Sequence, residues 1–154
     1  HVGIIEDGRL LSLRESRSSY ASDTLAELGA LDGEPVPLAQ WPGARCSAEF
    51  CVATIEREGR DYHLLLARGR DYVTERDLAA ACARVDIVVA DRWLPRSCRP
   101  RWLKADRRML EETGGLAIRL APQDVRTVSQ GQGAHGWWHG AGDVERARPA
   151  LSPQ

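Results

Sequence analysis

Residues 85–90 read VDIVVA, an apolar run interrupted by a single aspartate. Valine and isoleucine branch at Cβ and favour extended backbone, and such a run is typical of a strand buried on both faces of its sheet. The run directly follows residues 74–84, where Thr74 can cap a helix that has Leu78 and Cys82 one turn apart on one face. A helix followed at once by a doubly buried strand predicts a layered α/β domain.

Two β-hairpins are predicted upstream of this unit. Residues 2–5 and 10–13 are apolar runs around an Asp-Gly pair, which is a strong hairpin signal. Residues 51–57 and 61–67 carry β-branched and aromatic side chains on either side of Glu-Gly-Arg, and they indicate a second hairpin.

The chain between the hairpins is expected to hold one helix and one loop. Residues 20–28 have apolar side chains at helical spacing and are followed by Gly29. Residues 31–42 contain three prolines and a glycine, which interrupt helices and strands, so this stretch is expected to be a loop.

The C-terminal part divides into regular elements and a tail. Residues 105–112 predict a helix, and residues 116–120 and 125–128 predict two strands. From Gln130 onward the chain is rich in Gly, Pro and Ala and has little apolar periodicity. We therefore expect one α/β domain over residues 1–129 and a flexible tail over residues 130–154.

Composition bounds the class of protein. With 154 residues, 43% of them hydrophobic and 28% charged, the chain suits one globular domain with a core. No run approaches the roughly 18 to 20 apolar residues of a membrane-spanning helix, so a soluble chain is expected. It begins at His1 without a signal-peptide pattern, which indicates a fragment of something longer. The net charge of −1 argues against nucleic-acid binding by the whole surface, so any such binding must be local.

The four cysteines are Cys46, Cys51, Cys82 and Cys98. None of them forms a Cys-x-x-Cys pair, which makes a zinc ribbon or thioredoxin-like site unsupported. Two disulfides in an oxidising compartment and four separately buried thiols are both open readings. A bridge from Cys46 to Cys51 would close a turn and one from Cys82 to Cys98 would join a helix to a loop, but four cysteines allow three connectivities.

Residues 91–108 form a basic segment, with seven Arg or Lys against two Asp. Arginine and lysine neutralise phosphates, and an indole ring can stack on an unpaired base. The segment is thus a candidate contact for single-stranded DNA, and the alternative is a solvated loop whose tryptophans anchor it to the core. The candidate residues are Arg92, Trp93, Arg96, Arg99, Arg101, Trp102, Lys104, Arg107 and Arg108.

Catalytic and metal-binding patterns are not found in the sequence. His1 lies at the start of the chain, His63 in a predicted strand, and His135 and His139 in the predicted tail, so no rigid element carries two histidines. There is no Gly-x-Ser-x-Gly turn and no phosphate-binding glycine loop. We predict no catalytic residue, no metal site and no cofactor.

Several stretches together resemble the extreme C-terminal region of ComEC proteins, the channels for incoming single-stranded DNA, in their alphaproteobacterial form. The matching stretches are EDGRLLSLR (6–14), SSYASDTLAE (18–27), WPGARCSAEFCVA (41–53), LAAACARVDIVVADRWLPRSCRPRWLKADRRML (78–110) and GGLAIRL (114–120). The placement of the four cysteines is the most specific part of the resemblance.

In many ComEC proteins this region resembles a metallo-β-lactamase fold with a His-x-His-x-Asp-His metal motif. No such motif occurs in this chain. The positions where the resemblance would put ligands hold Ala67, Arg68, Gly69, Asp91 and Arg92. The resemblance therefore implies a truncated or degenerate metallo-β-lactamase-like fold without hydrolytic function.

The resemblance also implies a place and a role. It suggests a non-catalytic domain at the periplasmic face of the inner membrane, attached to the membrane channel domain of the same polypeptide and guiding single-stranded DNA. An alternative is a structural module for channel homo-oligomerisation or for docking a partner. A third reading is a metal-dependent nuclease with displaced ligands.

Overall fold

The structure is a computed structural model that describes residues 1–14 and 19–131. The predicted tail therefore lies outside the described residues from position 132 onward, together with His135 and His139. The described part is a mixed α/β structure with three sheets, which confirms the predicted α/β class.

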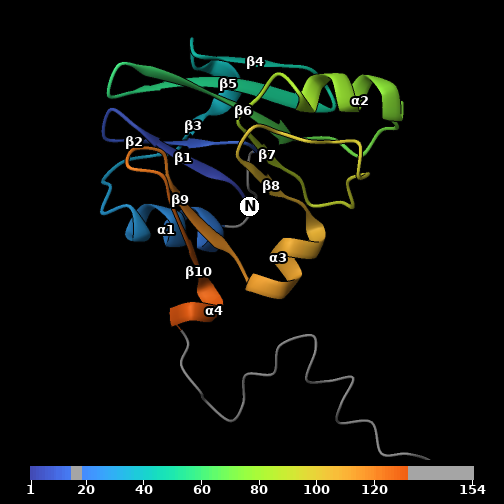
Figure 1. Ribbon diagram of the computed structural model, residues 1–154. Helices are drawn as coiled ribbons and strands as arrows, with labels where there is room; N and C mark the ends of the chain where they lie inside the picture. The colour runs from blue at the N-terminus through green and yellow to red at the C-terminus, as the bar shows by residue number, and fades with distance from the viewer. Residues whose placement is uncertain (15–18, 132–154) are drawn as a thin grey trace, which may run out of the picture.

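The largest sheet has five strands in chain order (Figure 1). They are β4 (Ala44–Cys46), β5 (Phe50–Arg57), β6 (Arg60–Ala67), β7 (Ile87–Val89) and β8 (Leu103–Ala105). The pairs β4/β5 and β5/β6 are antiparallel, whereas β6/β7 and β7/β8 are parallel. Parallel neighbours need a crossover, and helix α2 (Glu75–Cys82) supplies the one from β6 to β7.

A second sheet contains β1, β2 and β3, and a third contains β9 and β10. Their bounds are β1 (Gly3–Glu6), β2 (Arg9–Ser12), β3 (Val36–Pro37), β9 (Leu116–Arg119) and β10 (Asp124–Thr127). The remaining helices are α1 (Ser19–Leu28), the 3-10 turn η1 (Leu38–Gln40), α3 (Arg107–Thr113) and α4 (Val128–Gly131).

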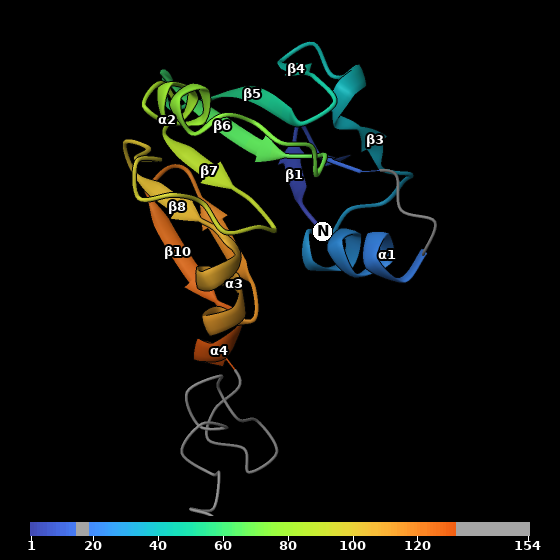
Figure 2. The ribbon, with the colours of Figure 1, turned by 90° about the vertical axis from the view of Figure 1, so that its right-hand side faces the viewer.

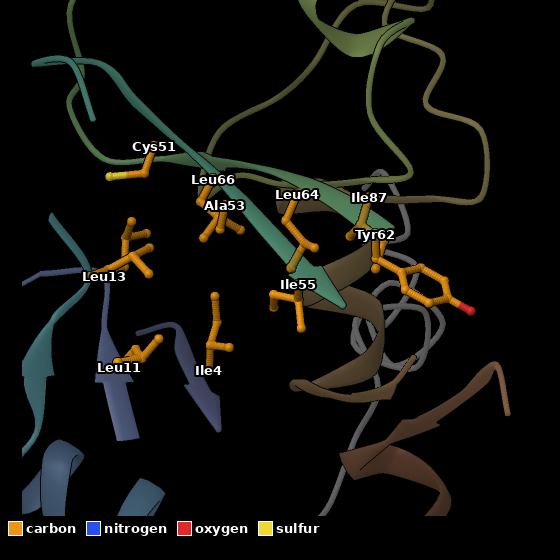
Figure 3. Packing of buried hydrophobic residues seen from close by; sticks show 11 residues of the cluster. Ile4, Leu11, Leu13, Cys51, Ala53, Ile55, Tyr62, Leu64, Leu66 and Ile87 are labelled. Carbon is orange, nitrogen blue, oxygen red and sulfur yellow. The ribbon is translucent and has the colours of Figure 1, made fainter. Parts of the chain in front are cut away.

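Two hydrophobic clusters cover the two faces of the large sheet. The first lies between this sheet and the β1–β2 hairpin, where Ile4, Leu11 and Leu13 face the side chains of β5 and β6 (Figure 3). The second contains Leu65 and Val88 and is covered by α2 and the chain after β7 (Figure 2). Ile87 packs in the first cluster and Val88 in the second, so the strand is buried on both faces as the VDIVVA run predicts.

Both predicted hairpins form, and their turns explain why. Asp7 and Gly8 have φ of 48° and 69°, and Glu58 and Gly59 have φ of 53° and 75°. Positive φ at both central residues is the type of two-residue turn whose twist matches that of paired strands. The second loop therefore contains two residues, and Arg60 already belongs to β6.

The residues that cap the helices are also close in sequence to the groups that they cap. Thr74 accepts a hydrogen bond from the Asp77 amide at the start of α2, and Asp106 accepts one from the Met109 amide at the start of α3. The C-terminal cap of α3 is Gly114 with φ of 72°. Because Asp106 is the cap, the prediction that α3 begins at residue 105 is wrong, and Ala105 ends β8.

Two polar contacts tie the layers together. The Arg57 guanidinium on β5 forms a two-pronged ion pair with the Glu6 carboxylate on β1, which joins the two sheets. The Asp86 side chain, 2% exposed, accepts the His63 amide at 2.8 Å and lies 3.4 Å from Arg60 and 3.8 Å from Arg101. A buried carboxylate needs such partners to offset its lost hydration.

Candidate functional site

The carboxyl ends of β6 and β7 bring two loops together. Because β6 and β7 are parallel neighbours, residues 68–74 and 90–102 leave the same edge of the sheet. Phe50 pairs with Ala67 and lies at this edge too. Ligand sites of α/β proteins favour this edge of a parallel sheet.

The two loops border a surface hollow of about 390 Å³ that is open to solvent. Large aromatic side chains at its rim are exposed: Tyr72 by 87% and Trp93 by 61%. We call this site the aromatic hollow. Its lining residues are Phe50, Arg70, Asp71, Tyr72, Val73, Glu75, Leu78, Arg92, Trp93, Leu94 and Pro95.

The loop that carries Trp93 is fixed to α2. Cys98 forms a disulfide with Cys82, and both residues are buried. Leu94 packs beside them in the same cluster. Ser97 adds a hydrogen bond of 2.6 Å to the Glu75 carboxylate. The backbone on either side of Trp93 is therefore held, while the indole ring remains in solvent.

Arg92 forms part of the wall of the aromatic hollow. Its Nη1 donates to the Asp71 carbonyl at 3.0 Å, and its guanidinium lies 5.0 Å from the centre of the Phe50 ring. Within the described residues its Nε and Nη2 are buried and find no hydrogen-bond acceptor. A cation over a ring face is stabilised by the ring quadrupole. Arg92 thus positions residues 70–73 and is not a free surface cation.

The other predicted residues fall into separate groups. Trp102 packs against Tyr62 in the cluster between the sheets, with ring centroids 6.4 Å apart. Trp93, in contrast, lies on the loop that covers the opposite face, next to Leu94. The two tryptophans therefore do not form one stacking surface.

Most of the predicted cations already have partners. Arg101 lies by Asp86, Arg107 pairs with Glu111 at 2.6 Å, and Arg108 pairs with Glu112 at 3.1 Å. The hydrogen bond that Arg107 donates to the Glu111 carboxylate raises the pKa of the Arg107 guanidinium. The Lys104 ammonium donates to the Pro95 carbonyl at 3.4 Å.

Arg96 and Arg99 differ from these residues. Both are exposed, and within residues 1–14 and 19–131 neither forms an ion pair with a carboxylate. The Arg99 Nε donates only to the Arg96 carbonyl, at 3.3 Å. Arg96, Arg99 and Trp93 are therefore exposed side chains of the same loop, the one that follows β7.

The Arg14 side chain connects the chain at the end of β6 with the chain just after β7. The Arg14 guanidinium donates to the Arg68 carbonyl at 2.8 Å, to the Ala67 carbonyl at 3.4 Å and to the Asp91 carboxylate at 3.0 Å. This hydrogen bond lowers the pKa of Asp91. Among the described residues, no three His, Cys, Asp or Glu side chains are grouped so that they could hold a metal ion.

Sequence reasoning missed Arg14, Arg70 and Tyr72. Tyr72 had one available signal, because it follows a predicted strand within the charged stretch RGRDY, where an aromatic side chain has no core to enter. Arg14 had none, since its partners are 54 and 77 residues away in the chain.

The cysteine pairing proposed from the sequence is confirmed. Cys46 lies directly opposite Cys51 across β4 and β5 and is bonded to it, and Cys82 is bonded to Cys98. Disulfides persist in oxidising compartments, so the chain has the character of an extracytoplasmic domain. None of the helices in the described residues is long and apolar enough to cross a membrane.

Comparison of the chain with protein-family models, with curated proteins and with solved structures gives no match. The geometry itself defines a disulfide-linked α/β domain with an aromatic surface hollow at the carboxyl ends of two parallel strands.

Proposed function

We propose that the chain is a non-catalytic, extracytoplasmic domain of a ComEC-like DNA-uptake channel and that it guides the incoming single strand. The observation that carries this proposal is the loop after β7. It is anchored by the Cys82–Cys98 disulfide and presents Trp93, Arg96 and Arg99 to solvent. The periplasmic location at the inner membrane and the attachment to a channel domain follow from the ComEC resemblance.

The absence of hydrolysis is part of the proposal. The residues at the expected ligand positions are poor metal ligands, apart from Asp91. The Asp91 carboxylate already binds the Arg14 cation at 3.0 Å. A divalent ion at the same carboxylate would face like-charge repulsion from that guanidinium.

Guiding a strand requires weak and local contacts. The formal net charge is −1, so the attraction for phosphates has to come from a few exposed cations. Arg96 and Arg99 are suited to this role because their charges are not neutralised by a carboxylate in the described residues. Each phosphate contact on a single strand contributes roughly 0.7 to the slope of log affinity against log salt concentration.

The test is a fluorescence-anisotropy titration of the oxidised chain with labelled single-stranded and double-stranded DNA at several salt concentrations. We expect saturable, salt-sensitive binding of the single strand. In the variant Arg96→Ala/Arg99→Ala the salt slope should fall by about 1.4, from two lost phosphate contacts.

The matched control is Arg107→Ala/Arg108→Ala, which removes the same charge from residues already paired with Glu111 and Glu112. It should change the affinity and the slope much less. Absence of single-strand binding at low salt would contradict the proposed function, and equal effects of the two double variants would show that the loop is not the contact.

A further inference from the structure

Two large aromatic side chains of the aromatic hollow are not packed in the hydrophobic core. Tyr72 and Trp93 come from different loops, are 87% and 61% exposed, and line the same hollow. Exposed aromatic side chains gathered around a concavity are typical of binding sites, because their apolar faces would otherwise favour burial. Tyr62 and Trp102 show the contrasting case, since they pack on each other in the core.

The apolar residues of the lining and the size of the hollow suit a small ring system. Besides the two rings, the apolar residues of the lining are Phe50, Val73, Leu78, Leu94 and Pro95. The volume of about 390 Å³ is at the lower end of ligand pockets, which span roughly 300 to 1,000 Å³. Such a site favours a flat, weakly polar group over a long chain or a hydrated ion.

The charges of the lining decide which part of a DNA strand enters. Arg70 and Arg92 are offset by Asp71 and Glu75, so the hollow has no net charge to attract a phosphate. Exposed cations are nevertheless within reach of a phosphate outside the hollow, because the lining residue Arg70 is exposed and the exposed Arg96 follows the lining residue Pro95. This arrangement favours an uncharged group inside the hollow and negatively charged groups outside it.

We propose that the aromatic hollow binds an unpaired nucleobase of single-stranded DNA, which stacks on Tyr72 and Trp93 while Arg70 contacts an adjoining phosphate. This inference rests on the proposed function and adds the site that distinguishes a single strand from a duplex. In a duplex the faces of the bases are already stacked on one another, so only an unpaired base can offer its face to the rings.

The experiment compares two oligonucleotides that carry the same phosphates, a labelled oligothymidylate and the corresponding abasic strand. The variants are Tyr72→Ala and Trp93→Ala, with Tyr72→Phe and Trp93→Phe as changes that keep a ring. Tyr20→Ala is the matched control, since Tyr20 is 79% exposed on α1 and lies outside the hollow. Urea unfolding of each variant checks that stability is retained.

On oligothymidylate, each alanine variant should weaken binding by roughly fivefold or more, as expected for the loss of one stacked base. The phenylalanine variants and Tyr20→Ala should bind nearly as the unchanged chain does. On the abasic strand the unchanged chain should bind more weakly, and the alanine variants should have no further effect.

The possible failures separate the inference from the proposed function. Single-strand binding that depends on Arg96 and Arg99 but is unaffected by Tyr72→Ala and Trp93→Ala overturns the inference and leaves the function standing. Equal affinity for duplex and single strand, or for the abasic and the normal strand, also overturns the inference. Loss of self-association in the alanine variants without any change in DNA affinity would make the hollow a protein interface. Absence of all single-strand binding overturns both proposals.

Discussion

The Cys82–Cys98 disulfide is predicted to contribute more to stability than the Cys46–Cys51 disulfide, and the difference follows from chain length. The perturbation is the double variant Cys82→Ala/Cys98→Ala in one protein and Cys46→Ala/Cys51→Ala in the other. The sequence separations are 16 and 5 residues. A cross-link stabilises the native state mainly by restricting the unfolded chain, and longer loops lose more entropy.

The loop-closure relation gives the magnitudes. A loop of 16 residues corresponds to about 3 kcal/mol at 25 °C. A loop of 5 residues corresponds to about 2 kcal/mol. The first double variant should therefore be about 1 kcal/mol less stable than the second. Both Cys82 and Cys98 are buried, whereas in the other pair Cys51 is buried and Cys46 is only partly buried, so the small voids left by alanine act in the same direction.

The assay is urea unfolding of the unchanged chain and the two double variants, monitored by circular dichroism. The comparison requires that the free energy of unfolding depend on urea concentration with the same slope in all three proteins. Limited trypsin digestion reports on the loop itself, because cleavage between Arg96 and Ser97 should become faster only when the Cys82–Cys98 bond is absent. Equal losses of stability, or a reversed order, would refute the chain-entropy reasoning. Unchanged cleavage would refute the view that this disulfide fixes the loop.

Two further predictions concern charged groups. Asp86→Ala should lower the free energy of unfolding by about 1 to 3 kcal/mol in urea titrations, because it leaves the partly buried His63 amide without its acceptor, whereas loss of the exposed partner Arg101 should cost less than about 1 kcal/mol. The Arg14 hydrogen bond lowers the pKa of Asp91, so its contribution is present above the unfolded pKa of about 3.9 and is lost as the pH falls through the folded value. Both side chains are partly exposed, so Asp91→Asn should cost at most about 1 kcal/mol at pH 7, and the difference from the unchanged chain should vanish in acid.

The elements that could be predicted from the sequence are those specified by neighbouring residues. The hairpin turns depend on Asp7-Gly8 and Glu58-Gly59, which adopt positive φ locally. The start of α2 depends on the Thr74 cap, three residues from its donor. The strand that is buried on both faces is predicted by the apolar, β-branched residues of the VDIVVA run itself. No distant contact is needed to recognise any of these features.

The strands that could not be predicted are two or three residues long. β3, β4 and β8 are too short to show an alternation of apolar and polar side chains, and longer-range pairing decides them: β3 pairs with β2, and β4 and β8 pair with strands of the five-stranded sheet. Leu103–Ala105 becomes a strand because β7 offers it a parallel edge. The Gly- and Pro-rich stretch before β4 was expected to be a loop, and the structure adds β3 and η1 within it.

The same topology explains why the basic segment did not remain one patch. The chain leaves β7 at Val89, covers one face of the sheet with Leu94 and Cys98, and returns to the sheet edge as β8. Trp102 and Leu103 then pack on the opposite face, since the returning chain reaches the cluster between the two sheets. Residues nine positions apart in sequence, Trp93 and Trp102, are thereby separated by the thickness of a sheet.

Trp93 nevertheless shares the aromatic hollow with a second exposed ring, Tyr72, which comes from another loop. Because β6 and β7 are parallel and adjacent, the residues that follow them share one edge, and Tyr72 reaches the hollow that Trp93 lines. At the same edge the Arg14 guanidinium binds the Asp91 carboxylate at 3.0 Å, next to the lining residue Arg92. The parallel strand pair thus brings two exposed aromatic rings from separate loops to one hollow, and the abasic-strand comparison tests whether those rings contact a base.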